Sequence, residues 1–441
     1  MARAKKETAL TPEERLQAAL VPDWEWPYKL PENWCWLKLV ESFDNHTDSK
    51  KKIKQKDYLV KGKLAVVDQG QELIGGYTND VEKSYSGALP IVIFGDHTRC
   101  IKFVDFPFAQ GADGVKVLRP KPFYLPKAFY YALQSVNIPN LGYRRHFPLF
   151  NKFSIPLPPF AEQQRIVDRI ESLFAKLDEA KEKAQAVVDS FETRKAAILH
   201  KAFTGELTAK WREEHGVGME SWHLRTIGEV CENVKVGIVI KPSQYYVPQN
   251  EGTPAFRSAN VRECRIDDFN WVYLNEKGMK DNSRSIVHTE DVLVVRSGNP
   301  GTACVVPERF DGYNAIDILI AVPNKKIIIS DYLCYYTNSP LGKKTVEIGK
   351  RGIALTHFNV KGFSQMPINI PTIPEQVVIV RTLGDLFAQE QQAKKAAEAV
   401  LDQIDLMKKS ILARAFRGEL GTNDPSEESA MELLKEIIRR G

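Results

Sequence analysis

Apolar residues recur at alternating steps of three and four in two long stretches of the chain. This spacing places them on one face of a helix and is the heptad pattern of a coiled coil. In the first stretch they are Ile166, Ile170, Leu173, Leu177, Ala180, Ala184, Val187, Phe191 and Ile198. In the second they are Ile379, Leu383, Leu386, Ala393, Ala397, Val400, Ile404, Met407 and Ile411. Each stretch predicts a helix of about 40 residues, and the seams are interrupted at Arg194 and Glu390.

The two stretches are copies of each other. Residues 155–207 align with 368–420 without a gap, and 23 of the 53 positions are identical. Prolines mark the start of each copy, because proline cannot lie inside a helix, and Gly205 and Gly418 mark the ends. A lone helix of this length cannot bury its seam, so the copies are expected to pair as an antiparallel coiled coil. The alternative is that each helix packs only on its own neighbouring domain.

The sequence before each copy has the period-2 and β-branched runs that are typical of strands. These runs include Leu64–Asp68, Pro90–Phe94, Ile101–Asp105, Val292–Arg296 and Ala303–Pro307. We therefore predict an α+β fold in which two mixed, β-rich heads alternate with two long helices. The predicted parts are an N-terminal helical segment at 1–29, a first head at 30–154, a helical spacer at 155–218, a second head at 219–367, and a second spacer with a C-terminal helix at 368–441.

Two shorter helices complete the predicted plan. The run Thr11-Pro-Glu-Glu14 is a capping box with proline at the first helical position, and it predicts a helix to about Leu20. Asp424-Pro425 is expected to open a C-terminal helix that contains Leu434.

Composition narrows the class of protein. The chain has 441 residues, of which 43% are hydrophobic and 27% charged, as in globular proteins. No apolar run approaches the ~20 residues of a membrane span, and the first residues lack a secretory apolar segment. The sequence therefore predicts a cytoplasmic protein with no membrane partner. The net charge of +5 is compatible with nucleic acid binding but weak support for it.

Sequence motifs for catalysis and cofactor binding are missing. The six cysteines show no metal-ligand spacing, and no glycine-rich phosphate loop or nucleoside loop is present. Leu157-Pro-Pro-Phe160 is similar to the loop of adenine-N6 methyltransferases but lacks the Asn or Asp that holds the target amine. Asp96-His97 is interpreted as a polar loop tip, since no nucleophile accompanies it. The sequence thus predicts no catalytic residue, no metal site and no cofactor site in this chain.

Two heads on a rigid helical rod suggest a device that reads two places at a fixed spacing. Base edges are read by Arg, Lys, Asn and Gln, and phosphates by Lys and Arg. In the first head the candidate DNA contacts are Lys51, Lys52, Lys54, Gln69, Tyr77, Thr78, His97, Thr98, Arg99, Arg144, Arg145 and His146. In the second head they are Lys241, Ser243, Gln244, Tyr245, Arg257, Ser258, Asn260, Arg296, Ser297, Asn299, Arg351 and His357.

These motifs together resemble the specificity subunit of type I restriction–modification systems. The resemblance rests on the Ile-Pro-x-Pro-Pro-x-x-Glu-Gln run at 155–163 with its copy at 371–376, and on Ala-Phe-x-Gly-Glu-Leu at 202–207 and 415–420. It also rests on Leu-Pro-x-x-Trp at 30–34. In the second head, the runs that start at Lys241, Arg257, Arg296 and His357 resemble one recurrent class of target-recognition domain.

The resemblance implies a DNA-binding restriction-system subunit without catalysis of its own. Each head would be a target-recognition domain that reads one half of a split, asymmetric site in double-stranded DNA. The helices would set the spacing and dock two modification subunits, which bind S-adenosylmethionine and perform DNA methylation. Two restriction subunits that use ATP and Mg²⁺ would join that core.

Two other functions compete with this one. One is a self-contained DNA adenine methyltransferase, which the missing cofactor loop argues against. The other is a coiled-coil adaptor that does not bind DNA, which two large and mutually diverged heads argue against.

Overall fold

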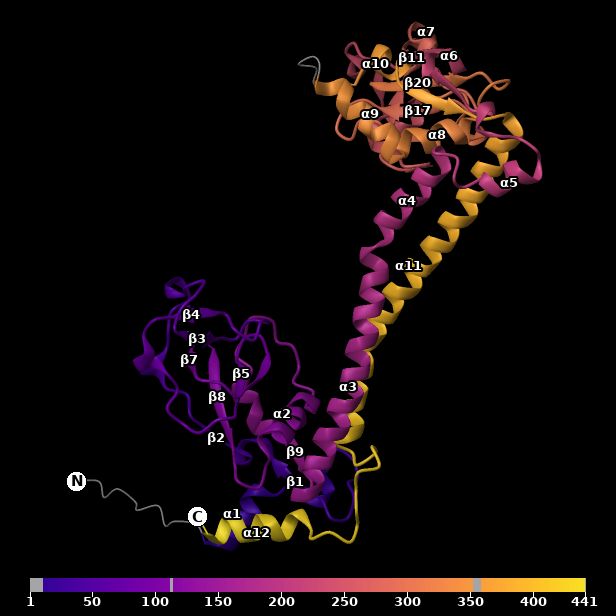
Figure 1. Ribbon diagram of the computed structural model, residues 1–441. Helices are drawn as coiled ribbons and strands as arrows, with labels where there is room; N and C mark the ends of the chain where they lie inside the picture. The colour runs from indigo at the N-terminus through magenta and orange to yellow at the C-terminus, as the bar shows by residue number, and fades with distance from the viewer. Residues whose placement is uncertain (1–10, 112–113, 352–357, 441) are drawn as a thin grey trace. The chain divides into compact units, whose positions relative to one another are not determined.

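The computed structural model describes residues 11–111, 114–351 and 358–440, with only the backbone described at 347–351 (Figure 1). The chain divides into two compact units. The first unit consists of Met1–Ala184 and Ala399–Gly441, and the second of Gln185–Glu398. Among the described residues, no helix is long and apolar enough to cross a lipid bilayer.

The first unit holds the first head. Its shorter helices are α1 (Pro12–Ala19), α2 (Pro126–Ser135) and α12 (Ala430–Arg440). Its strands are β1 (Cys35–Lys38), β2 (Phe43–Asn45), β3 (Leu64–Val67), β4 (Gly76–Thr78), β5 (Ile91–Gly95), β6 (Ile101–Val104), β7 (Phe108–Gln110), β8 (Val115–Pro120) and β9 (Ser154–Leu157). They form a four-stranded sheet in the order β2-β8-β5-β6, a three-stranded sheet β4-β3-β7, and the pair β1-β9.

The second unit holds the second head. Its helices include α5 (Ala209–Glu214), α6 (Ile227–Val230), α7 (Glu276–Asp281), α8 (Ser330–Asn338), α9 (Pro340–Arg351) and α10 (Val360–Ser364). Its strands are β10 (His223–Thr226), β11 (Cys231–Val236), β12 (Tyr246–Val247), β13 (Thr253–Phe256), β14 (Val261–Arg262), β15 (Arg265–Ile266), β16 (Val272–Leu274), β17 (Val292–Val295), β18 (Ala303–Val305), β19 (Asn314–Ala315), β20 (Ile318–Pro323) and β21 (Pro367–Ile370). The sheets are β11-β20-β17-β18, β12-β16-β13-β19, β14-β15 and β10-β21.

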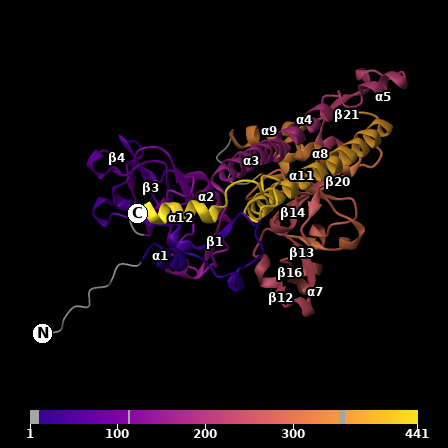
Figure 2. The ribbon, with the colours of Figure 1, turned by 90° about the horizontal axis from the view of Figure 1, so that it is seen from below.

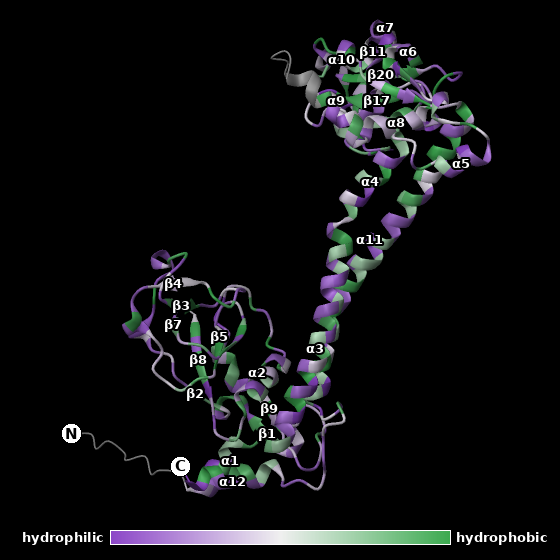
Figure 3. Cartoon of the chain, viewed as in Figure 1, coloured by the Kyte–Doolittle hydropathy of each residue, from purple (hydrophilic) through white to green (hydrophobic). Residues whose placement is uncertain are grey.

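Apolar strands make the core of each head. β5 and β17 are each buried along their whole length, and each is an interior strand of a four-stranded sheet. Figure 3 draws these central strands mostly in the colour of hydrophobic residues. The five strands expected from period-2 runs coincide with β3, β5, β6, β17 and β18, so the strand predictions are confirmed.

The long helices are α3 (Phe160–Asp189), α4 (Phe191–Phe203) and α11 (Ile373–Ala415). They pair antiparallel within each unit. In the first unit Lys408 Nζ lies 2.5 Å from Asp178 Oδ1, and in the second Arg194 Nε lies 2.8 Å from Glu390 Oε2. The two residues that interrupt the predicted seams are therefore bound to each other across the pair.

Two details of the helices differ from the expectation. The first copy is not one continuous helix, since Ser190 separates α3 from α4. Ser190 Oγ donates to Ala186 O at 2.5 Å, a back-bond that bends helices. In the second copy, Ala393, Val400 and Met407 are exposed rather than in the seam.

The short terminal helices follow the prediction at the start of the chain and depart from it at the end. Thr11 Oγ1 accepts from Glu14 N, and Glu14 Oε2 accepts from Thr11 N, which is the expected capping box. α12 begins at Ala430 instead of Asp424, because Asp424 accepts from Ser426 and forms a turn. α12 lies against α1 in both views (Figures 1 and 2).

The repeated Glu-Gln pair anchors each head to its helix. Gln163 Oε1 accepts from Leu125 N at 2.7 Å, and its Nε2 donates to Phe123 O at 2.8 Å. Gln376 Oε1 accepts from Ile329 N at 2.9 Å, and its Nε2 donates to Ile327 O at 2.8 Å. Both glutamines are fully buried. The same two residues of each copy therefore fix a loop of each head onto the first turn of a long helix.

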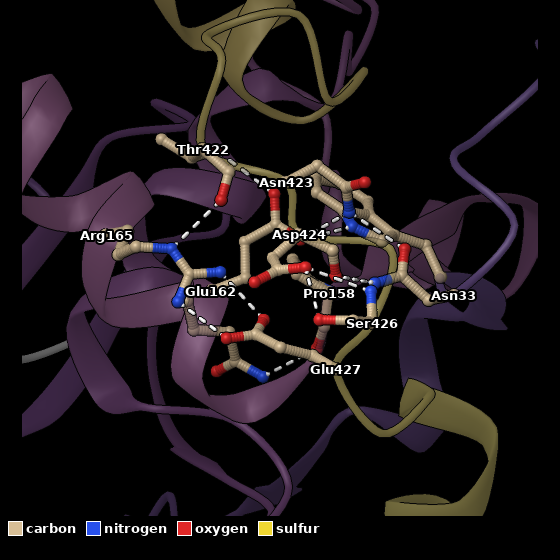
Figure 4. A network of polar contacts seen from close by, with 11 residues as sticks. Asn33, Pro158, Glu162, Arg165, Thr422, Asn423, Asp424, Ser426 and Glu427 are labelled. Carbon is tan, nitrogen blue, oxygen red and sulfur yellow. Dashed lines mark hydrogen bonds and ion pairs between the residues drawn. The ribbon is translucent and has the colours of Figure 1, made fainter.

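The glutamate of each pair binds a tryptophan at the start of its head. Trp34 Nε1 donates to Glu162 Oε2 at 2.7 Å, and Trp222 Nε1 donates to Glu375 Oε2 at 2.9 Å. The other donors to each glutamate come from the segment that follows the long helix of the other copy. Arg212 NH1 lies 2.6 Å from Glu375 Oε1, while Figure 4 shows the C-terminal segment around Glu162.

In that C-terminal segment, Asn423 Nδ2 donates to Glu162 Oε2 at 2.8 Å, and Thr422 Oγ1 donates to Glu162 Oε1 at 3.1 Å (Figure 4). Arg165 forms a bidentate pair with Glu427, with both N–O distances at 2.7 Å. Residues near the end of the chain thus complete the anchor of the first head.

Candidate nucleic-acid interface

One group of predicted residues in the first head gathers at the turn between β5 and β6. Thr98 Oγ1 donates to Gln69 O at 2.6 Å, and His97 N donates to Gln69 Oε1 at 3.1 Å. Arg99 has φ +60°, a left-handed conformation that is uncommon for a residue with a side chain, and its NH1 donates to Ile138 O at 2.9 Å. The turn is therefore held in one shape by its own side chains.

The loop that follows α2 joins this turn. Tyr143 stacks on His97, with ring centroids 4.8 Å apart and 13° between the planes. Arg144 and Arg145 come next and are exposed. The buried His146 holds this loop in place. Its Nδ1 lies 2.8 Å from Asp96 O, and its Nε2 accepts from Leu141 N at 3.1 Å. Two arginines and an aromatic–histidine stack thus surround the turn.

The lysine run and the β3–β4 sheet form a second group in the first head. Lys51 Nζ donates to Ser84 O at 3.1 Å, and Lys52 and Lys54 lie on either side of the buried Ile53. Tyr77 pairs with Ala65 on β3. Lys54 is exposed, and Lys51 and Lys52 are half-buried, so their charges remain near solvent.

In the second head, strand register brings predicted residues to one edge. β17 and β20 pair up to Val295 and Ile318, so the next residues, Arg296 and Asp317, face each other. Ile316 N donates to Phe256 O at 2.8 Å, which places Arg257 beside the same edge. Ser258 follows Arg257, Ser297 follows Arg296, and Asn299 is exposed in the next turn.

Lys241 and the residues after it follow the strand β11. Lys241 is exposed and has φ +42°, and Ser243, Gln244 and Tyr245 form the 3-10 turn behind it. Tyr245 OH lies 3.4 Å from Asp281 Oδ2. Non-glycine residues in the left-handed region are costly and concentrate at functional sites, and here Arg99, Lys241 and Asp317 all have this conformation within or beside the predicted groups.

Three predicted contacts are buried. Asn260 donates to Phe269 O and accepts from Arg257 N, Thr78 Oγ1 accepts from Asp80 N, and His146 holds its own loop. Their burial favours a positioning role over direct DNA contact. His357 lies outside the described residues, as does the side chain of Arg351.

Tyr143 and Asp317 are two residues that the sequence analysis missed. Tyr143 directly precedes Arg144-Arg145, and an exposed aromatic beside two arginines was a usable signal. Asp317 carries no signal of its own, because only the pairing of β17 with β20 places it against Arg296.

Metal chemistry finds no support in the part of the chain that the structure describes, where no cluster of three His, Cys, Asp or Glu side chains is placed to hold an ion. Four of the six cysteines are buried, namely Cys35, Cys231, Cys304 and Cys334, and burial raises the pKa of the Cys35 and Cys231 thiols to about 12.

Comparison with known protein families decides the relationship. A family model described as the type I restriction modification DNA specificity domain matches residues 31–188 and 219–401. The chain belongs to this family. The two matches overlap the two heads and the long helices that follow them, which is the division expected from the internal repeat.

Curated relatives are specificity subunits of the same class of system. The chain is 26% identical over 300 residues to the type I restriction enzyme EcoBI specificity subunit of Escherichia coli, and the match covers 64% of this chain and 63% of that one. It is also 26% identical over 310 residues to the EcoKI specificity subunit of Escherichia coli strain K12, with 65% and 64% covered. The chain thus spans slightly less than two thirds of the length of these relatives.

Solved structures share the fold. The HsdS subunit from Thermoanaerobacter tengcongensis superposes with a TM-score of 0.58 at 18% identity, covering 90% of this chain and all of that one. A chain from a structural study of the assembly of the type I R-M system superposes with a TM-score of 0.61 at 19% identity, covering 89% and 100%. Two β-rich heads alternating with paired long helices are therefore the fold of this chain.

Proposed function

We propose that this chain is the sequence-specific DNA-binding subunit of a type I restriction–modification complex. Each head reads one half of a bipartite, asymmetric site, and the helices set the spacing between the halves. The observation that supports this most is that both heads carry arginine-bearing turns at strand ends, and that both are fixed to their helices by the same Glu-Gln pair.

The chain supplies no catalytic centre to that complex. The motif that is similar to a methyltransferase loop has a structural explanation, because Pro158 and Pro159 are buried between β9 and α3, and Pro158 O accepts from Gln163 Nε2 at 3.1 Å. This favours the specificity role over a self-contained methyltransferase. The strained turns at Arg99 and Lys241 favour it over an adaptor that does not bind DNA.

Partner subunits dock on the helices. In the first unit, α11 exposes three apolar side chains outside the coiled-coil seam: Val400 is 40% exposed, Leu406 65% and Met407 48%. Exposed apolar side chains so close together on a helix favour a protein partner. We assign this face to one of two modification subunits, which supply S-adenosylmethionine and the methyl transfer. Two restriction subunits, which need ATP and Mg²⁺, join the same complex in the cytoplasm.

The first experiment maps methylated adenines in DNA from cells that carry this chain with its companion subunits, against a deletion of this chain. We expect a split motif with a fixed gap that loses its methylation on deletion. Unchanged methylation, together with no sequence-selective DNA binding by the purified complex, would refute the proposal.

A variant pair assigns the halves to the heads. Arg296→Ala should lower affinity about tenfold for the half-site that the second head reads, and Arg144→Ala should do so for the other half-site, since an arginine contact to a base contributes about 1–3 kcal/mol. Equal loss of both halves from either variant would contradict the assignment.

A further inference from the structure

Arg296 and Asp317 form a side-chain pair at the edge of the second head. Val295 and Ile318 are the last residues in register on β17 and β20, so the next residue on one strand faces the preceding residue on the other. Arg296 NH1 lies 2.8 Å from Asp317 Oδ1, and Ser297 Oγ lies 3.3 Å from Asp317 Oδ2. One carboxylate therefore holds two successive residues of the predicted DNA-binding turn.

The backbone on both sides of this pair is fixed. Asp317 has φ +51°, and its N–H donates to Ile238 O at 3.0 Å. Arg296 O accepts from Phe358 N at 3.2 Å. A non-glycine residue keeps a left-handed conformation only where its surroundings enforce it, and such positions cluster at binding sites. The left-handed backbone of Asp317 is thus found at the residue whose carboxylate binds Arg296.

The pair is accessible but not free. The side chain of Arg296 is 16% exposed and that of Asp317 is 40% exposed. Arg296 Nε is buried and has no partner among the described residues. The guanidinium is therefore held through NH1 at the surface of the head, with its orientation limited by the carboxylate.

The charge of the pair indicates what it can bind. A DNA phosphate is an anion, and a carboxylate 2.8 Å from the guanidinium opposes it. A base edge carries no net charge, so the same carboxylate opposes it less than it opposes a phosphate. Lys241, in contrast, is exposed at a strained turn and pairs with no carboxylate in the described part of the chain; this favours a phosphate contact for Lys241 and a base contact for Arg296.

We propose that Arg296 reads a guanine in the half-site of the second head, and that Asp317 is the positioning residue that orients it. Guanine presents two acceptors in the major groove, O6 and N7, which match the two donors of a guanidinium. Asp317 restricts the rotamers of Arg296 before DNA binds, so less freedom is lost for each contact formed. This inference rests on the proposed function and adds a base identity and a second residue to it.

The test combines residue variants with a change of one base atom. The complete complex with its modification subunits is prepared as wild type, Asp317→Asn and Arg296→Lys. Asp268→Asn is the matched control, because Asp268 also faces an arginine of this head, Arg309 at 3.9 Å, and is 51% exposed. Methylation mapping gives the motif, and each guanine of the second half-site is then replaced by 7-deazaguanine, which lacks the N7 acceptor.

We expect the wild-type complex to lose affinity about tenfold for one of these replaced sites. The Asp317→Asn complex should tolerate other bases at that position and lose less than about threefold on replacement, while its preference for the first half-site is unchanged. Asp268→Asn should behave as wild type. The effect on one base atom is a readout that a purely structural role of Asp317 does not produce.

Three results would overturn the inference. The first is a second half-site without any guanine. The second is an Asp317→Asn complex that still shows the full wild-type loss of affinity with 7-deazaguanine. The third is an Asp317→Asn complex that binds both half-sites equally weakly, which is the result of misfolding. Failure of the proposed function gives a different result, in which no methylated motif and no sequence-selective binding depend on this chain at all.

Discussion

Single buried residues determine how the heads are attached. Glu162 and Glu375 are both fully buried, and each accepts from a tryptophan indole at the start of its head. The sequence predicted that these positions were equivalent, because they align in the repeat. It did not predict their partners, since Trp34 and Trp222 lie outside the aligned block and the remaining donors come from distant segments.

Removing the second of these carboxylates should destabilise the second unit. Glu375→Ala leaves the almost fully buried Arg212 without its partner, and a broken buried ion pair costs about 3–5 kcal/mol. Glu375→Gln should cost about 1–3 kcal/mol, since an amide still accepts from Trp222. Chemical denaturation measures both. Glu398→Gln, on an exposed position of the same helix, is the control and should change the free energy of unfolding by less than about 0.5 kcal/mol.

A second carboxylate should make stability depend on pH. Burial alone would raise the pKa of Glu263, but hydrogen bonds from Lys195 and Lys343 lower it below its usual value. A carboxyl group with a lowered pKa in the folded state stabilises that state above its unfolded pKa, about 4.3, and the contribution disappears as the pH falls through the folded value.

The thermal midpoint of wild type should therefore exceed that of Glu263→Gln at pH 7, by a difference equivalent to about 1 kcal/mol. The difference should shrink as the pH is lowered from 5 to 3. Glu206→Gln, at an exposed position of the same unit, should show no such convergence. A difference that stays constant with pH would contradict the ion-pair explanation.

At the scale of elements, the coiled-coil pair was predictable but the composition of its seam was not. The heptad spacing indicated both long helical stretches and the interruptions of the seam at Arg194 and Glu390, but it did not show that Ser190 divides the first stretch into α3 and α4. A seam assigned from apolar residues alone includes Ala393, Val400 and Met407, but all three side chains are exposed. The structure instead uses lysines near those positions: Lys394 Nζ lies 4.6 Å from the centre of the Phe191 ring, and Lys408 Nζ lies 5.1 Å from that of Phe174.

Long amphipathic side chains explain this difference, because the stem of a lysine covers apolar surface while its charge lies over an aromatic face. A hydrophobic pattern cannot show this, since it scores lysine as polar. The same reasoning applies to Arg194 and Glu390, which looked like defects in each helix separately and are complementary when paired.

The Arg194–Glu390 contact should behave as a coupled pair. Arg194→Leu or Glu390→Leu alone should destabilise the second unit by about 1–2 kcal/mol, because each leaves a partly buried charge unpaired. The double variant should recover most of that loss, since well-packed apolar residues often replace such pairs at no cost. A double-mutant cycle measures the coupling, and strictly additive losses would refute it.

At the scale of the whole molecule, the repeat predicted the order of head and helix, and the family match and fold agree with it. The strand-end groups in each head were only partly predictable. Arg296 and Arg257 come together through a register that joins distant segments, and a single sequence does not show which strands are neighbours.

Lengthening both helices together should lengthen the gap of the DNA motif. A heptad inserted between Asp178 and Phe191, matched by one between Lys394 and Lys408, preserves the seam and adds about 10 Å, or about three base pairs. Methylation mapping reads the new gap. A heptad in only one helix shifts the pairing of Arg194 with Glu390 and should abolish activity; an unchanged gap with matched insertions would refute the role of the helices as a ruler.

The anchor at Glu162 also has a consequence for synthesis on the ribosome. Thr208 and Arg212 emerge before Glu375, so the second anchor closes as soon as the start of α11 is made. Thr422 and Asn423 bind a carboxylate that is translated some 260 positions before them. The anchor of the first head therefore stays incomplete until the second head and both long helices have been translated. A chain released before Thr422 is translated lacks these donors to Glu162, and its first head should be less stable than that of a chain that contains them.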